Sequence, residues 1–232
     1  MIYWGIDITY IIYVLPALIF TLIAQAAVQS AYRSASAMRC RSGLSGAGAA
    51  ERVLRAAGVS GVRIEPVSGK LSDHFDPKGN VIRLSEGVFS APTIAACGIA
   101  AHECGHAVQY AKGYAPLRLR NAIIPVSQFG SAAAIPLILL GFLFQFQALV
   151  TAGILFFAAA VLFQLITLPV EFNASRRAMA LLEDAGVLAP EELPAARRVL
   201  RAAAMTYVAA LAVSVMQLVR LIVLFGGRKN DR

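Results

Sequence analysis

The chain has 232 residues, of which 58% are hydrophobic and only 15% charged, and its net charge is +8. Soluble globular proteins are typically about 45–50% apolar and about 25% charged, so the composition disfavours a soluble protein and indicates a membrane protein. The 21 Lys and Arg residues lie between long apolar blocks, a distribution that suits membrane orientation better than a nucleic-acid patch. The odd number of cysteines, three without a C-x-x-C pair, argues against a disulfide framework.

The first apolar block covers residues 8–32 and contains no charged residue. It exceeds the length of about 20 residues that crosses a bilayer. We therefore expect an N-terminal transmembrane helix within residues 1–32. A cleaved signal peptide is the alternative, but no basic segment precedes the block and the apolar run is too long for one.

Residues 33–125 hold 12 of the basic residues and are expected to form a water-facing region. Helices are predicted at 47–57 and 92–112, the second with Pro92 in its first turn and Gly113 as its stop. Between them, residues 62–71 and 81–84 are typical of short strands. Turn-forming residues at 76–80 predict a small β-hairpin over residues 68–84.

Residues 126–170 carry no charge and predict two transmembrane helices with a turn near Gln145 and Gln147. A polar segment, 171–203, separates them from a last apolar run within 204–232. This run is either a fourth span or a helix in the membrane interface with Arg220 reaching water. The basic tail, Arg228, Lys229 and Arg232, weighs against a span.

The two basic loops, 33–125 and 171–203, carry 17 of the 21 Lys and Arg residues. Positively charged loops stay on the cytoplasmic side of membranes. We therefore expect a multi-pass protein of the cell's inner (plasma) membrane, with both loops in the cytoplasm and the N-terminus outside.

The sequence His102-Glu103-Cys104-Gly105-His106 fits the motif H-E-x-x-H. On a helix, residues i and i+4 share a face, so both imidazoles can bind one Zn²⁺ ion. Glu103 lies beside the metal as the general base for a zinc-bound water. Cys104 is interpreted as a small packing residue.

Hydrolytic zinc sites use a third protein ligand, and the residues alone leave two candidates for it. His74 is the only other histidine, and it sits next to turn-forming acids. Glu171 follows the predicted third span, where a carboxylate is often just a solvated helix end. Pro169 precedes Glu171 and could bend the helix so that the carboxylate reaches the zinc helix.

Several stretches, in chain order, resemble the YugP-like family of membrane-bound neutral zinc metallopeptidases. They are residues 69–77 (GKLSDHFDP), 81–85 (VIRLS), 100–109 (AAHECGHAVQ), 168–175 (LPVEFNAS) and 206–210 (TYVAA). The resemblance implies a gluzincin-like site with Glu171 as the third ligand. It also implies a distant similarity to HtpX-like and prenyl-protein endopeptidases. Those enzymes have an Asp four residues after the ligand Glu, whereas this chain has Ser175, so a supporting carboxylate cannot be carried over.

Five residues are candidates for substrate binding, and three of them have a stated structural alternative. Asp73, His74 and Phe75 lie at the start of the hairpin, where an extended peptide can add as a strand. Asp73 could instead cap the turn. Arg176 could stabilise charge or anchor the helix in the membrane, and Tyr207 could bond an intermediate or simply pack.

The sequence thus predicts a mainly α membrane protein with a zincin-like helix, a small β-hairpin and three to four transmembrane helices. Its expected function is that of a membrane-anchored zinc metalloendopeptidase acting on protein or peptide substrates at the cytoplasmic surface. The expected partners are the bilayer and the substrate, without nucleic acid. A non-catalytic zinc-binding membrane scaffold is the alternative. A metal transporter is disfavoured, because the three strongest spans lack ionisable residues.

Overall fold

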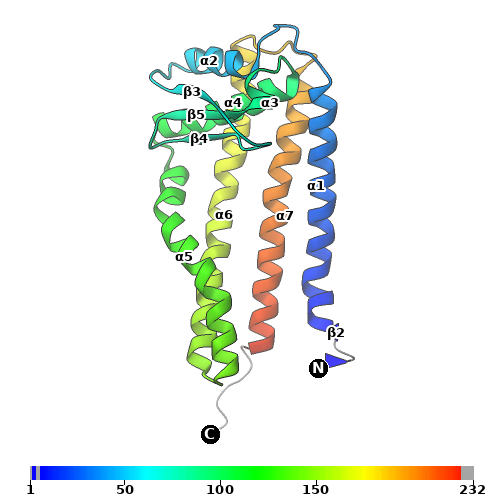
Figure 1. Cartoon of the computed structure of the whole chain (residues 1–232), viewed down its shortest axis with the longest axis vertical. Helices are drawn as coiled ribbons and strands as arrows, with labels where there is room; N and C mark the ends of the chain where they lie inside the picture. Colours follow the sequence, from blue (N-terminus) through cyan, green and yellow to red (C-terminus); the bar gives the residue numbers. More distant parts are fainter. Residues whose placement is uncertain (1, 4–5, 226–232) are drawn as a thin grey trace. The chain divides into compact units, whose positions relative to one another are not determined.

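The computed structural model describes residues 2–3 and 6–225, and most of them are helical (Figure 1). The predicted mainly α fold class is confirmed. The chain forms two compact units: unit 1 comprises residues 1–24, 119–168 and 206–232, and unit 2 comprises residues 25–118 and 169–205. The basic tail in residues 226–232 lies outside the described residues.

Unit 1 contains the apolar parts of four long helices. These helices are α1 (Leu15–Ser36), α5 (Ala115–Leu143), α6 (Gln147–Asp184) and α7 (Leu193–Phe225). A π-helical turn, η1 (Tyr10–Val14), leads into α1, and the short strands β1 (Ile2–Tyr3) and β2 (Ile6–Asp7) pair antiparallel before it. All four helices are long and apolar enough to cross a membrane. This agrees with the expected three to four spans and favours four.

Many large apolar side chains of unit 1 are exposed to the surroundings of the protein. They include Leu22, Phe142, Leu143 and Leu155, each more than 60% exposed. So many exposed large apolar side chains are typical of helices that face lipid. The predicted turn between the middle helices is confirmed, since α5 ends at Leu143 and α6 begins at Gln147.

The last helix, α7, continues through Arg220 to Phe225 without a break. The Nε of Arg220 donates a hydrogen bond to Oγ1 of Thr9, 3.2 Å away, and its guanidinium lies 5.5 Å from the ring centre of Tyr10. These contacts give the charged end of Arg220 polar and aromatic partners within unit 1. One cation near the end of α7 is therefore compatible with a spanning helix.

Unit 2 contains a three-stranded sheet with the order β3-β5-β4 (Figure 1). Strands β4 (His74–Asp76) and β5 (Val81–Ser85) pair antiparallel, so a hairpin does form around the predicted turn, but its first strand is 74–76 and not the predicted strand 62–71. Asp76 closes its turn by accepting hydrogen bonds from the backbone N–H groups of Lys78 and Gly79. Strand β3 (Arg63–Val67) pairs parallel with β5 and is shorter than the expected strand 62–71.

Three helices of unit 2 pack with this sheet: α2 (Gly46–Ala56), α3 (Glu86–Phe89) and α4 (Ile94–Ala111). Helix α4 begins after Thr93, whose hydroxyl accepts a hydrogen bond from the N–H of Ala96, and it stops before Gly113 at φ +61°. Both limits agree with the sequence to within two residues. A positive φ suits glycine, so Gly113 ends the helix at little cost.

The core of unit 2 surrounds α4 with small and branched apolar side chains. Ala100, Ala101 and Cys104 of α4 are fully buried with Ala178 and Leu182 of α6. Small side chains on α4 allow neighbouring helices to approach it closely. This close packing positions the candidate site, which lies wholly within unit 2.

Candidate metal centre

The candidate site begins with two histidines on one face of α4. The imidazole rings of His102 and His106 have centroids 4.8 Å apart and meet edge to face at 86°. Their spacing of four residues along the helix produces this arrangement. The side chains are 17% and 12% exposed, so both rings are largely shielded from solvent.

Glu171 of α6 adds a carboxylate to the two imidazoles. Its Oε2 lies 3.3 Å from Nε2 of His102 and 3.7 Å from Nε2 of His106, and all three ligand atoms lie within 4.8 Å of one another. Ligand atoms at about 2.0–2.2 Å from a tetrahedral zinc ion are roughly 3.3–3.6 Å apart. Two imidazoles and a carboxylate are also a ligand set that zinc hydrolases use. The residues therefore fit a zinc ion in chemistry, and the two distances from Glu171 are close to this spacing.

Gly105 explains how Glu171 comes so close to the histidines. A Cβ atom added to Gly105 would lie only 2.5 Å from the backbone oxygen of Ala174 on α6. No side chain fits in that space, so glycine lets the two helix backbones approach each other. Helix α6 does not end at Glu171, as a span-end residue would suggest, but continues to Asp184 and carries this carboxylate on a rigid segment.

The Nδ1 atom of each imidazole also has a hydrogen-bond partner. Nδ1 of His106 lies 3.0 Å from Oε1 of Gln109, and Nδ1 of His102 lies 3.2 Å from Oγ of Ser175. Ser175 thus lies beside His102, at the position where the distant endopeptidases carry an Asp. The sequence reasoning missed Gln109, although its place three residues after His106 puts it on the same face of the helix.

Glu103, the predicted general base, is buried in α4 and only 7% exposed. Burial by itself lowers the pKa of the nearby His106, but a hydrogen bond with Glu171 and the negative charges of Glu103 and Glu171 outweigh it. The net result is a raised pKa for His106. The carboxylates of Glu103 and Glu171 therefore place negative charge beside His106.

Cys104, which also belongs to the motif, is completely buried, and burial raises the pKa of its thiol well above the ordinary value. A thiol with so high a pKa carries almost no thiolate near neutral pH, which makes it a poor nucleophile.

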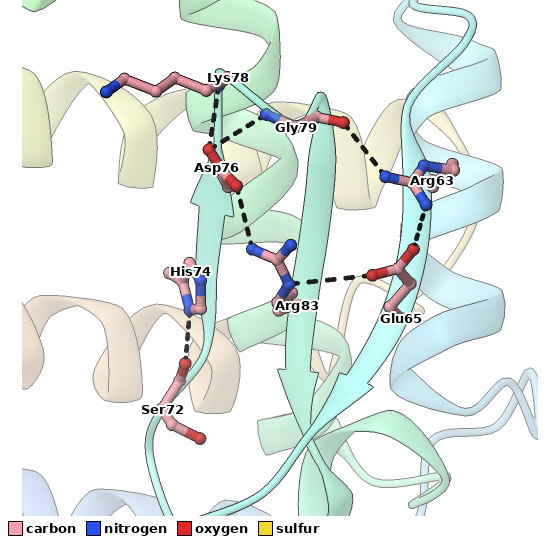
Figure 2. Close-up of polar contacts among 8 residues, drawn as sticks. All are labelled: Arg63, Glu65, Ser72, His74, Asp76, Lys78, Gly79 and Arg83. Carbon is pink, nitrogen blue, oxygen red and sulfur yellow. Dashed lines mark hydrogen bonds and ion pairs between the residues drawn. The ribbon is translucent and has the colours of Figure 1, made fainter.

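His74 does not belong to the metal-binding group of the described residues. It lies exposed on the edge strand β4, and its Nδ1 is 2.8 Å from the backbone oxygen of Ser72 (Figure 2). Its neighbour Phe75 is half-buried, with its ring 5.9 Å from that of Tyr110 on α4. Asp73 accepts hydrogen bonds from the backbone N–H and hydroxyl of Ser85, so it secures the end of β5.

Charged side chains extend across the sheet beside His74. Figure 2 shows Arg83 between Asp76 and Glu65, with Arg63 next to Glu65. These ion pairs link all three strands. The hydrogen bonds from Gly79 and Arg83 lower the pKa of Asp76, so this carboxylate stays ionised to a more acidic pH than an ordinary aspartate does.

The remaining candidates lie on the long helices. Arg176 is exposed on α6, five residues after Glu171, and Tyr207 on α7 is 43% exposed and belongs to unit 1. Neither is among the residues that could hold the metal.

The fold and the site together define a class: helical membrane proteins with a candidate metal centre of two imidazoles and a carboxylate. Residues 10–226 match the family described as "Putative neutral zinc metallopeptidase", and the chain belongs to this family. It is also 44% identical over 222 residues to "Putative membrane protease YugP" of Bacillus subtilis (strain 168), covering 96% of this chain and 99% of that protein. The resemblance expected from the sequence is thereby confirmed. No solved structure matches the chain.

Proposed function

We propose that this protein is a membrane-anchored zinc metalloendopeptidase. His102, His106 and Glu171 hold the zinc ion, and Glu103 is the general base. The observation that carries the proposal is the grouping of three ligand atoms within 4.8 Å, with Glu103 buried next to His102 on the same helix. Membership of the zinc metallopeptidase family supports the same chemistry.

A bound zinc ion lowers the pKa of a water molecule and polarises the carbonyl group of a peptide bond. Glu103 accepts a proton from the attacking water and returns it to the nitrogen of the leaving amine. The products are one new carboxylate and one new amine, so a single water molecule is consumed. Burial of Glu103 and Glu171 keeps bulk water away from the proton that is transferred.

The substrate is proposed to bind as an extended segment along β4. This strand is at the edge of its sheet and also contacts α4, the helix of the histidines. An edge strand has unpaired backbone groups that can bond a further strand. His74 and Phe75 are proposed to contact the substrate, whereas Asp73 shapes the strand through Ser85. Arg176 and Tyr207 remain further candidates for substrate contact.

The proposed site faces the cytoplasm from the inner membrane, because the basic residues concentrate in the two segments that supply it. Substrates would then be membrane proteins or unfolded segments close to the bilayer. The expected segments are a transmembrane helix in 1–32, two in 126–170 and one in 204–232, with cytoplasmic regions at 33–125 and 171–203.

The test of this function is zinc content together with casein cleavage, measured on the purified full-length protein. Glu103→Gln should retain zinc but lose cleavage by several orders of magnitude, because only the proton acceptor is removed. Glu183→Gln, a change of the same kind at an exposed position of α6, serves as the control and should cleave normally. Zinc binding by a wild-type protein that cleaves nothing would support the scaffold alternative instead.

A further inference from the structure

Gln109 has a side chain that is fully buried, yet the hydrolytic mechanism assigns it no role. Its amide makes three contacts. Oε1 lies 3.0 Å from Nδ1 of His106, while Nε2 lies 2.8 Å from the backbone oxygen of Val170 and 3.0 Å from Oδ1 of Asn173. One amide group thus joins a histidine of α4 to Val170 and Asn173, which lie on either side of Glu171 in α6.

The chemistry of these partners fixes which way the amide points. A backbone carbonyl can only accept a hydrogen bond, so the atom of Gln109 that faces Val170 must be the donating nitrogen. The Asn173 contact agrees, because the same Oδ1 also accepts a bond of 2.7 Å from Nε of Arg177, which can only donate. The guanidinium of Arg177 is held in turn 5.8 Å from the ring centre of Tyr114.

With the nitrogen turned toward α6, the amide oxygen must face His106. This oxygen can only accept a hydrogen bond, so Nδ1 of His106 must carry the proton. The neutral ring then has its lone pair on Nε2, the atom that lies 3.7 Å from Oε2 of Glu171. The partner of His102 is different, because the Ser175 hydroxyl can either donate or accept a hydrogen bond. This contact therefore does not fix the tautomer of His102.

We propose that Gln109 is a positioning residue of the metal centre. Its oxygen holds His106 in the Nδ1–H tautomer, so that Nε2 is available to the metal, and its nitrogen ties α4 to α6 beside Glu171. The proposal rests on the proposed function only in taking His102, His106 and Glu171 as metal ligands. It does not depend on which reaction the metal serves.

The tautomer can be measured directly because the chain has only three histidines. The full-length, zinc-free protein in detergent is labelled with ¹⁵N-histidine, and long-range ¹H–¹⁵N correlations are recorded at an alkaline pH where the rings are neutral. Spectra of His74→Ala and His102→Ala assign the signals. We expect His106 as the Nδ1–H tautomer. An Nε2–H ring at His106 in the wild-type protein would overturn the proposal by itself.

Two substitutions separate the contact of the amide oxygen from the two contacts of its nitrogen. Gln109→Met keeps the length of the side chain but removes all three contacts. The carboxylate of Glu171 then remains as an acceptor for the ring of His106, and the tautomer should change to Nε2–H. Gln109→Glu keeps an acceptor for Nδ1–H but loses the donor to Val170 and Asn173. It should retain the Nδ1–H tautomer while the protein unfolds at a lower temperature, because three acceptors then face one another.

Zinc affinity, measured by competition with a chromophoric chelator, gives the second readout. Gln109→Met should weaken binding by about 10–100-fold, as the loss of an outer partner of a metal-binding histidine typically does. Gln109→Glu should bind zinc more tightly than Gln109→Met. Gln147→Met, the same change at an exposed position on α6, is the matched control and should behave like the wild type.

An unchanged tautomer and unchanged zinc affinity in Gln109→Met would overturn the inference and leave the proposed protease intact. The opposite case is also distinguishable. If Gln109→Met lowers the zinc affinity while Glu103→Gln still cleaves casein normally, the positioning role of Gln109 is supported and Glu103 is rejected as the catalytic base. If Gln109→Met does not fold in detergent, the tautomer of His106 in the wild type and in Gln109→Glu tests the proposal. Both rings should be Nδ1–H.

Discussion

Glu171 is the proposed third metal ligand, and its substitution gives a sharp prediction. Glu171→Ala should lose zinc on dialysis, because it removes a ligand that lies 3.3 and 3.7 Å from the two imidazole nitrogens. The loss should exceed the 10–100-fold that typically follows removal of an outer residue. His74→Ala is the control: it should retain zinc, and the measurement is metal content after dialysis. The reverse pattern would make His74 the ligand.

At the scale of single residues, the sequence predicts contacts within one helix but not contacts between residues far apart in the chain. His102 and His106 share a face because of their spacing, which can be seen without a structure. The residues alone could not choose between His74 and Glu171, since both lie far along the chain from the helix. Gln109 was missed because its partners on α6, the backbone oxygen of Val170 and the side chain of Asn173, lie more than 60 residues away and no sequence pattern marks them.

Among the elements, the contact between α4 and α6 is close enough for a single added atom to disturb it. Gly105→Ala places a Cβ 2.5 Å from the backbone oxygen of Ala174, so the helices must separate. Overpacking of this kind typically costs about 1–3 kcal/mol. The shift should also carry Glu171 away from the imidazoles and weaken zinc binding. Thermal unfolding and chelator competition measure the two effects.

The control for this prediction is Gly87→Ala, in the short helix α3. A Cβ there meets no atom within 4 Å, so the substitution should leave zinc binding unchanged and keep or slightly raise the stability. Equal behaviour of the two alanine variants would mean that the close approach at Gly105 is not needed for the site.

In the sheet, the turn of the hairpin can be predicted from the sequence, whereas the pairing of the third strand cannot. The turn after Asp76 has a local signature, since aspartate and glycine at these positions suit a tight turn, and the hairpin was expected for that reason. The parallel partner β3 has no such signature, because parallel pairing depends on a connection elsewhere in the fold. The expected strand 62–71 also ended early: the backbone takes positive φ at Gly69 and Leu71, which no strand allows.

For the whole molecule, hydropathy was sufficient to find the long helices but not to settle the last one. Charge-free stretches of this length have few alternatives to a membrane helix, so the first three were predictable. Arg220 left open whether the fourth apolar run spans the membrane, because a sequence does not show which residues surround a single cation. The structure supplies Thr9 and Tyr10 as its partners and extends α7 to 33 residues.

The orientation of the protein in the membrane is the remaining whole-molecule prediction. The two segments 33–125 and 171–203 carry 17 of the 21 basic residues, and two spans between them put both on one side. Lys and Arg near the ends of spans favour the cytoplasmic side, so this side should be the cytoplasm. The turn between α5 and α6 must then face outward, and the N-terminus with it.

Cysteine labelling of intact cells with a membrane-impermeant maleimide tests this orientation. The three native cysteines are buried, so they should add little background. Gln147→Cys, exposed at the start of α6, should be labelled, whereas Ser60→Cys, exposed in the first basic segment, should react only with a permeant reagent or after lysis. Labelling of Ser60→Cys from outside would place the basic segment, and the candidate metal centre with it, on the outer face. It would also restore the cleaved signal peptide as an interpretation of the first apolar block, because the segment would then have crossed the membrane.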